Sequence, residues 1–143
     1  MLLWNKQTIL IVEDDADQRS LLQQWFELEG YSVITADGGA AALELIARCR
    51  PDLILTDLWM PEMDGIELIR RLRSRADFTE IPIVALSAVH VDLPKAMATG
   101  ADGAAQKPID LDGLTKLIKR LLSRVKTVVQ ENAKLPPLAA LHF

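Results

Sequence analysis

Short apolar segments alternate with amphipathic segments along most of the chain. Residues 8–12, 31–36, 52–56, 81–86 and 104–106 are apolar over lengths typical of strands. The segments between them repeat apolar residues every three or four positions, which is the spacing of one face of a helix. This alternation predicts an α/β protein in which each strand is followed by a helix that crosses back over a parallel sheet.

Helices are expected after each of these strands. The second is expected over residues 40–48, the third from about residue 64, the fourth over residues 94–99 and the last from residue 110 to about residue 130. Because crossover connections are right-handed, the five units predict a three-layer (βα)5 doubly wound, flavodoxin-like fold with strand order 2-1-3-4-5. The first helix is expected to stop at Gly30. Its apolar stripe is expected to comprise Leu21, Leu22, Trp25, Phe26 and Leu28.

Length and composition narrow the class of protein. The 143 residues suit one domain, expected over residues 7–125, with residues 126–143 extending the last helix into an apolar tail. A net charge of −4 without a long basic run argues against direct nucleic-acid binding. The absence of a membrane-length apolar segment or a signal peptide predicts a cytoplasmic protein. The single cysteine, Cys49, excludes an internal disulfide and is expected to be buried or half-buried.

Polar side chains occur where the expected strands end. Glu13 and Asp14 follow the first strand, Asp57 the third, Ser87 the fourth and Lys107 the fifth. The carboxyl ends of parallel strands meet at one edge of a sheet, so these residues are expected to converge. Neighbouring carboxylates repel one another unless a cation neutralises them, and ligands that are all oxygen favour Mg²⁺. A carboxylate beside Mg²⁺ can attack phosphorus and form an aspartyl phosphate.

Each of these residues also has a simpler interpretation. Acidic residues after a strand often cap the next helix, and Asp15 is expected to do so. Taken singly, Asp57 is equally consistent with a helix cap, Ser87 with a loop hydroxyl and Lys107 with a solvated surface lysine. The functional interpretation is favoured because four strand ends together offer what one phosphoryl site requires.

Five motifs resemble those of the receiver domain of response regulators, and they occur in that family's order. They are residues 11–15 (IVEDD), 57–65 (DLWMPEMDG), 86–88 (LSA), 100–102 (GAD) and 107–108 (KP). The nine residues from Asp57 to Gly65 are the most specific of them. The resemblance covers about residues 7–125 and implies that the chain accepts a phosphoryl group from a histidine kinase or a histidine phosphotransfer protein.

The resemblance also implies a role for each matching residue. Asp57 corresponds to the phosphoacceptor, and it would hold Mg²⁺ together with Asp14 and the backbone carbonyl of Trp59, with Glu13 acting through a water. The bond between Lys107 and Pro108 is expected to be cis. The positions that correspond to switch and phosphate-binding residues are Ser87, Ala88 and Lys107.

Some positions depart from the family pattern. Ala104 stands where the family usually has Tyr or Phe, and Ile109 stands where an aromatic residue is common. Since that aromatic side chain normally relays the signal, output is expected through the loop after the fourth strand or through the last helix. Trp59 and Val89 lie where attacking water must pass, and their bulk predicts slow autodephosphorylation. The simpler interpretation is that Trp59 packs on the surface.

Other functions remain open on the sequence alone. The apolar stripe of the last helix continues through Val125 and Val128, so this helix could pair with a second copy of the chain or with a partner's helix. The simpler interpretation is a linker helix that leaves the domain. Ala104 is also compatible with a scaffold that needs no phosphorylation. An aspartyl-phosphate phosphatase would have an acid in place of Trp59, and a flavin protein would have a Ser/Thr/Gly-rich loop in place of the acids after the first strand. Both enzyme hypotheses are therefore disfavoured.

Overall fold

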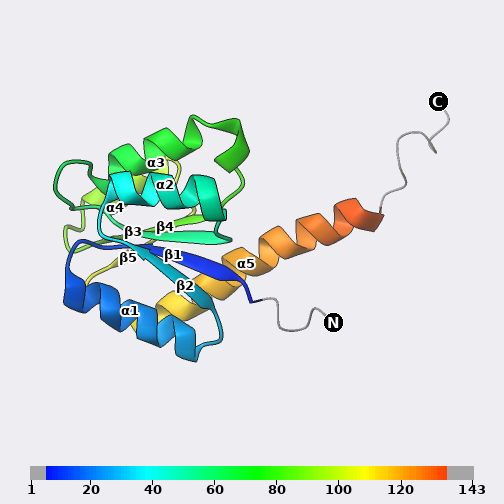
Figure 1. Ribbon diagram of the computed structural model, residues 1–143, viewed down its shortest axis with the longest axis horizontal. Coiled ribbons are helices and arrows are strands. Elements are labelled where there is room, and N and C mark those ends of the chain that lie inside the picture. The colour runs from blue at the N-terminus through cyan, green and yellow to red at the C-terminus, as the bar shows by residue number, and fades with distance from the viewer. Residues whose placement is uncertain (1–5, 135–143) are drawn as a thin grey trace.

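The computed structural model describes residues 6–134, with side chains described up to residue 124. Five parallel strands form one sheet in the order β2-β1-β3-β4-β5, which confirms the predicted fold (Figure 1). The strands are β1 (Thr8–Val12), β2 (Ser32–Ala36), β3 (Leu53–Asp57), β4 (Ile83–Ser87) and β5 (Gly103–Gln106). The helices are α1 (Ala16–Leu28), α2 (Gly39–Cys49), α3 (Gly65–Arg73), α4 (Asp92–Thr99) and α5 (Leu111–Lys134), with a 3-10 turn η1 (Ala76–Phe78).

Successive residues of each central strand face opposite sides of the sheet and build two separate cores. In β1, Ile9 and Ile11 pack with residues of α1 and α5, whereas Leu10 and Val12 pack with residues of α2, α3 and α4. Figure 1 shows these two sets of helices on opposite faces of the sheet. Strands covered on both faces need apolar residues at almost every position, which explains the continuous apolar run of β1.

Local signals set the beginnings of two helices. Asp15 accepts a hydrogen bond from the backbone N–H of Gln18 at the N-terminus of α1, as expected. Asp64 does the same for the N–H of Glu67 at the N-terminus of α3. Each cap satisfies a backbone donor that has no partner inside the helix, and a cap of this kind stabilises a helix by about 1 kcal/mol.

Two expectations about burial were wrong. Cys49 is exposed as the last residue of α2, beyond Ile46, which is the last buried residue of that helix. Leu21 and Leu28, which were expected on the buried stripe of α1, are 56% and 85% exposed. The sheet covers the narrower stripe made by Leu22 and Phe26, which are four residues apart and therefore on one side of the helix.

Helix α5 begins on the sheet and continues beyond it. Leu114, Ile118, Leu121 and Leu122 are buried in the core shared with α1. Figure 1 shows the rest of the helix extending away from the domain. The dimer hypothesis refers to Val125 and Val128, whose side chains are outside the part of the chain that the structure describes. The expected tail from residue 135 is outside it as well. Within residues 6–134, no helix has both the length and the apolar character needed to span a bilayer.

Candidate functional site

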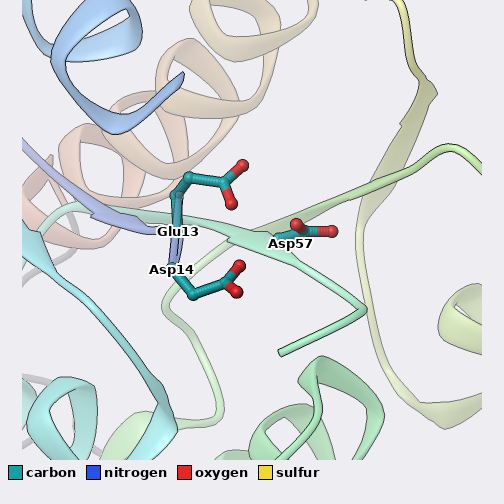
Figure 2. A group of neighbouring side chains, drawn as sticks. All are labelled: Glu13, Asp14 and Asp57. Carbon is teal, nitrogen blue, oxygen red and sulfur yellow. The ribbon is translucent and has the colours of Figure 1, made fainter. Parts of the chain in front are cut away.

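Three carboxylates meet beyond the ends of two adjacent strands. Glu13 and Asp14 follow β1, and Asp57 is the last residue of β3, with Val12 paired to Thr56 in the parallel register. One carboxylate oxygen from each acid lies within 4.8 Å of the others, and Figure 2 shows the three side chains together. Glu13 and Asp57 are buried, while Asp14 is exposed. The predicted convergence of the acids is therefore confirmed.

Lys107 enters the same pocket from the end of β5. Its Nζ donates to Oε1 of Glu13 over 2.9 Å, to Oδ2 of Asp57 over 3.0 Å and to Oε1 of Gln18 over 2.7 Å. An ammonium group has three N–H donors, so all of them are used. The peptide bond between Lys107 and Pro108 is cis, as expected. Sequence reasoning missed Gln18, because its position on the first turn of α1 carries no motif that indicates contact with Lys107.

The charges in this pocket alter the protonation of two groups. Burial raises the pKa of the Glu13 carboxyl from 4.5 to about 7, and the negative charge of Asp57 adds to the effect, against the lowering influence of the Lys107 hydrogen bond. Burial by itself lowers the pKa of Lys107, but its hydrogen bonds to Glu13 and Asp57 outweigh burial and raise that pKa above 10.5. The lysine is therefore charged at neutral pH, whereas Glu13 is close to its midpoint.

Ser87 lies at the end of β4 and is buried. Its Oγ accepts a hydrogen bond from the backbone N–H of Val89 over 3.0 Å, while its backbone carbonyl accepts from the N–H of Lys107 over 2.9 Å. The neighbouring Ala88 is exposed. The hydroxyl thus holds the turn of its own loop, and a hydroxyl can rotate to donate to a different acceptor.

Trp59 borders the acids on the side of α4. Its backbone N–H donates to Oδ1 of Asp57 over 3.3 Å, and its indole Nε1 donates to Oδ2 of Asp92 over 2.7 Å. The side chain is 61% exposed, and Val89, the other residue expected to restrict water, is 39% exposed. Asp92 was not identified from the sequence, because the fourth helix was expected to begin two residues later, at Pro94.

The backbone around Asp57 is held by close packing against α3. A Cβ added to Gly65 would lie 2.3 Å from the carbonyl oxygen of Asp57 and 2.8 Å from Cα of Leu58, closer than real Cβ atoms approach. The same carbonyl accepts from Oγ1 of Thr56 over 2.9 Å, and the N–H of Gly65 donates to the carbonyl of Leu58. Glycine at this position therefore allows the loop after β3 to fold back against its own strand.

Ala104 lies in β5 opposite Ala85 of β4 and is half-buried. A shallow hollow of about 270 Å³ lies beside it, lined by Pro108, Leu114 and Leu117 among others. The methyl group of Ala104 cannot fill such a space or swing between two positions as a ring can.

The donor set of the pocket suits a hard divalent cation. Every side chain of the acidic group offers oxygen, and the carboxylates are close enough for a single ion to contact all three. Mg²⁺ commonly binds through one or two carboxylates and retains several waters, which fits a pocket in which Asp14 faces solvent. The group therefore fits Mg²⁺, with Lys107 already neutralising part of its charge.

Fold and pocket together define a doubly wound α/β protein with acids and a lysine at the carboxyl edge of its sheet. Residues 9–119 match the model of the response regulator receiver domain. The chain belongs to this family of two-component signalling proteins, and the family is not one of dedicated enzymes.

Relatives with curated functions support the assignment. The chain is 35% identical over 130 residues to the Regulator of RpoS from Escherichia coli K12, and the match covers 89% of this chain and 39% of that protein. It is 40% identical over 120 residues to the response regulator MprA from Mycobacterium leprae, covering 82% of this chain and 52% of MprA. The chain therefore spans only about two fifths to one half of these relatives.

A solved structure shows the same architecture. The signal receiver domain of a signal transduction histidine kinase from Syntrophus aciditrophicus superposes with a TM-score of 0.77 and is 34% identical. The match covers 96% of this chain and 99% of that one.

Proposed function

We propose that this chain accepts a phosphoryl group on Asp57, from a histidine kinase or a histidine phosphotransfer protein, and that phosphorylation changes a protein-interaction surface. The observation that carries the proposal is the position of Lys107, whose ammonium contacts the carboxylates of both Asp57 and Glu13. A buried carboxylate beside acids suited to Mg²⁺ and a fixed cation has what phosphoryl transfer requires. We take residues 7–125 as the receiver unit and residues 126–143 as an extension.

The transfer would proceed by attack of an Asp57 carboxylate oxygen on the phosphorus of the donor. A new O–P bond forms as the P–N bond of phosphohistidine breaks, and the imidazole leaves with the bonding electron pair. Lys107 would donate to a phosphoryl oxygen and reduce the negative charge that spreads over the transferring group. Ser87 would release the Val89 N–H and turn its hydroxyl toward another phosphoryl oxygen beside Ala88.

Glu13, Asp14, Asp57 and the backbone carbonyl of Trp59 would hold Mg²⁺. When bound, the ion supplies positive charge that removes the repulsion between the acids and the incoming phosphoryl group. Hydrolysis of the aspartyl phosphate requires a water in line with the O–P bond. The one polar group of the Trp59 side chain donates to Asp92, and the Val89 side chain has no polar group, so neither side chain is placed to orient that water. This supports a slow autodephosphorylation.

Intact-mass spectrometry tests the proposed function. The full chain is incubated with acetyl phosphate in the presence and absence of Mg²⁺, beside the Asp57→Ala variant. We expect a gain of about 80 daltons, the mass of one phosphoryl group, only in the unaltered chain and only with Mg²⁺. If neither acetyl phosphate nor a phosphorylated histidine phosphotransfer protein modifies the chain, the proposal is wrong and a scaffold becomes the better description.

We also propose that α5 can pair with a second copy of the chain. The support is its length of 24 residues, which carries it past the sheet. Leu114 and Leu121 are buried in the domain core, so a second copy could contact only the later part of the helix. Sedimentation velocity of the full chain over a range of concentrations, with and without acetyl phosphate, tests this. A monomer at every concentration would contradict it.

A further inference from the structure

Trp59 touches the acceptor carboxylate with its main chain and helix α4 with its side chain. The backbone N–H contacts Oδ1 of Asp57 at 3.3 Å, and the indole N–H contacts Oδ2 of Asp92 at 2.7 Å. Asp92 is the first residue of α4. One residue of the loop after β3 therefore connects Asp57 directly to the helix that follows β4.

The contact between Trp59 and Asp92 is well suited to transmit a displacement. Indole N–H is only a donor, and a carboxylate acceptor makes the hydrogen bond shorter and stronger than a neutral one. The Trp59 ring is rigid and has only two side-chain torsions, so movement of its backbone moves the far end of the ring. Val91, the residue before α4, makes no side-chain capping hydrogen bond. The bond from Trp59 to Asp92 therefore reaches a helix N-terminus that no side-chain cap holds in place.

Helix α4 is held lightly enough to respond. Ala96 is the one residue of its eight that is buried, while Met97 and the preceding Val91 are 44% and 75% exposed. A helix with so little buried apolar surface opens or shifts at low cost compared with helices that carry the core. By contrast, five of the nine residues of α3 are buried.

The loop between β4 and α4 is also tied on its other side. Nδ1 of His90 and Oε1 of Gln106, at the end of β5, lie within hydrogen-bond distance at 3.2 Å. Oγ of Ser87 holds the N–H of Val89. Ala104 has no ring that could follow a movement of Ser87. The hydrogen bond from Trp59 to Asp92 instead links the loop after Asp57 directly to the first turn of α4.

We propose that the hydrogen bond between Trp59 and Asp92 carries the state of Asp57 to α4, and that Asp92 is a positioning residue that acts through Trp59. This inference rests on the proposed function, because phosphorylation of Asp57 is the event that is transmitted. Phosphorylation removes the full negative charge from the oxygen that accepts the Trp59 N–H. The strength of that bond changes, the Trp59 backbone shifts, and the ring moves Asp92.

Nuclear magnetic resonance of the ¹⁵N-labelled full chain tests the proposal. Spectra are recorded with and without beryllofluoride and Mg²⁺, which together imitate an aspartyl phosphate, and the α4 amides and the Trp59 indole N–H are followed. Asp92→Ala removes the acceptor, Asp92→Asn keeps an acceptor oxygen, and Trp59→Phe keeps a ring without the donor. Lys95→Ala is the control, since Lys95 is an exposed residue of the same helix.

We expect the shift changes of the α4 amides to fall to less than about half in Asp92→Ala and Trp59→Phe. They should remain in Asp92→Asn and in the Lys95→Ala control, while the amides of Ser87 and Lys107 respond in both Asp92 variants and in the control. A full α4 response in both Asp92→Ala and Trp59→Phe would overturn this inference and leave the proposed function intact. No response at Ser87, Lys107 or α4 in the unaltered chain, together with no mass gain from a phosphodonor, would overturn both.

Discussion

The ammonium group of Lys107 contacts the carboxylate of Asp57 at 3.0 Å, although the two residues are fifty positions apart in the chain. The lysine side chain is 17% exposed, so the contact is screened less by water than a surface ion pair. The pairing places a fixed positive charge where negative charge would develop during transfer to Asp57.

Replacement of this charge gives the first prediction. Lys107→Gln should lower the rate of phosphorylation by acetyl phosphate by about 10²-fold, the usual effect of losing one preorganised group that stabilises the transition state. Intact-mass time courses at saturating Mg²⁺ measure the rate. Lys116→Gln, on the exposed side of α5, is the matched control and should react like the unaltered chain. A Lys107→Gln rate within a factor of about two would contradict the assigned role.

The second prediction concerns pH. Burial raises the pKa of Glu13 to about 7 from 4.5, so between these values the folded chain binds a proton that the unfolded chain has lost. The contribution to stability is therefore complete below the unfolded value and is lost as pH rises toward 7. In EDTA, the free energy of unfolding should fall by on the order of 1–3 kcal/mol between about pH 5 and pH 7.

Urea denaturation across this pH range, without divalent cations, checks the second prediction. The Glu13→Gln variant cannot titrate at this position and should lose most of the slope, while keeping a side chain of similar size. An equal slope in both proteins would show that Glu13 does not cause it.

The third prediction concerns the lifetime of the phosphoryl group. Trp59→Asn should speed autodephosphorylation on the order of tenfold, or about 1.4 kcal/mol in the barrier, because an amide can orient water and the ring no longer obstructs it. Decay of the phosphorylated mass after removal of the donor gives the rate. Leu28→Asn changes a side chain that is 85% exposed on α1 and serves as the control. An unchanged lifetime in Trp59→Asn would leave surface packing as the better description of Trp59.

The fourth prediction concerns the backbone at Asp57. Gly65→Ala should lower the free energy of unfolding by about 2–3 kcal/mol, because its Cβ would lie 2.3 Å from the Asp57 carbonyl and the backbone must move. Gly38→Ala is the matched control, since a Cβ there has nothing within 4 Å and should change stability by less than about 1 kcal/mol. Urea denaturation measures the free energy of unfolding of both variants. Equal values would show that the loop after β3 can move at little cost to make room for the Cβ of residue 65.

The layered fold and the convergence of the acids could both be predicted from the amino-acid sequence. Apolar runs such as that of β1 can be satisfied only by a strand covered on both faces, and parallel strands bring their carboxyl ends to one edge. Glu13, Asp14, Asp57 and Lys107 therefore meet wherever this topology forms. The family motifs make their assignment more specific.

Which polar side chains pair across that edge depends on the folded arrangement and could not be predicted from the sequence. The contact of Trp59 with Asp92 and that of Gln18 with Lys107 join residues whose local sequences predict nothing about each other. The exposure of Leu21 and Cys49 likewise depends on which side of each helix packs against the sheet. Hydrophobic periodicity identifies a face of an element, whereas side-chain pairing and the limits of burial depend on how the packed elements are placed in three dimensions.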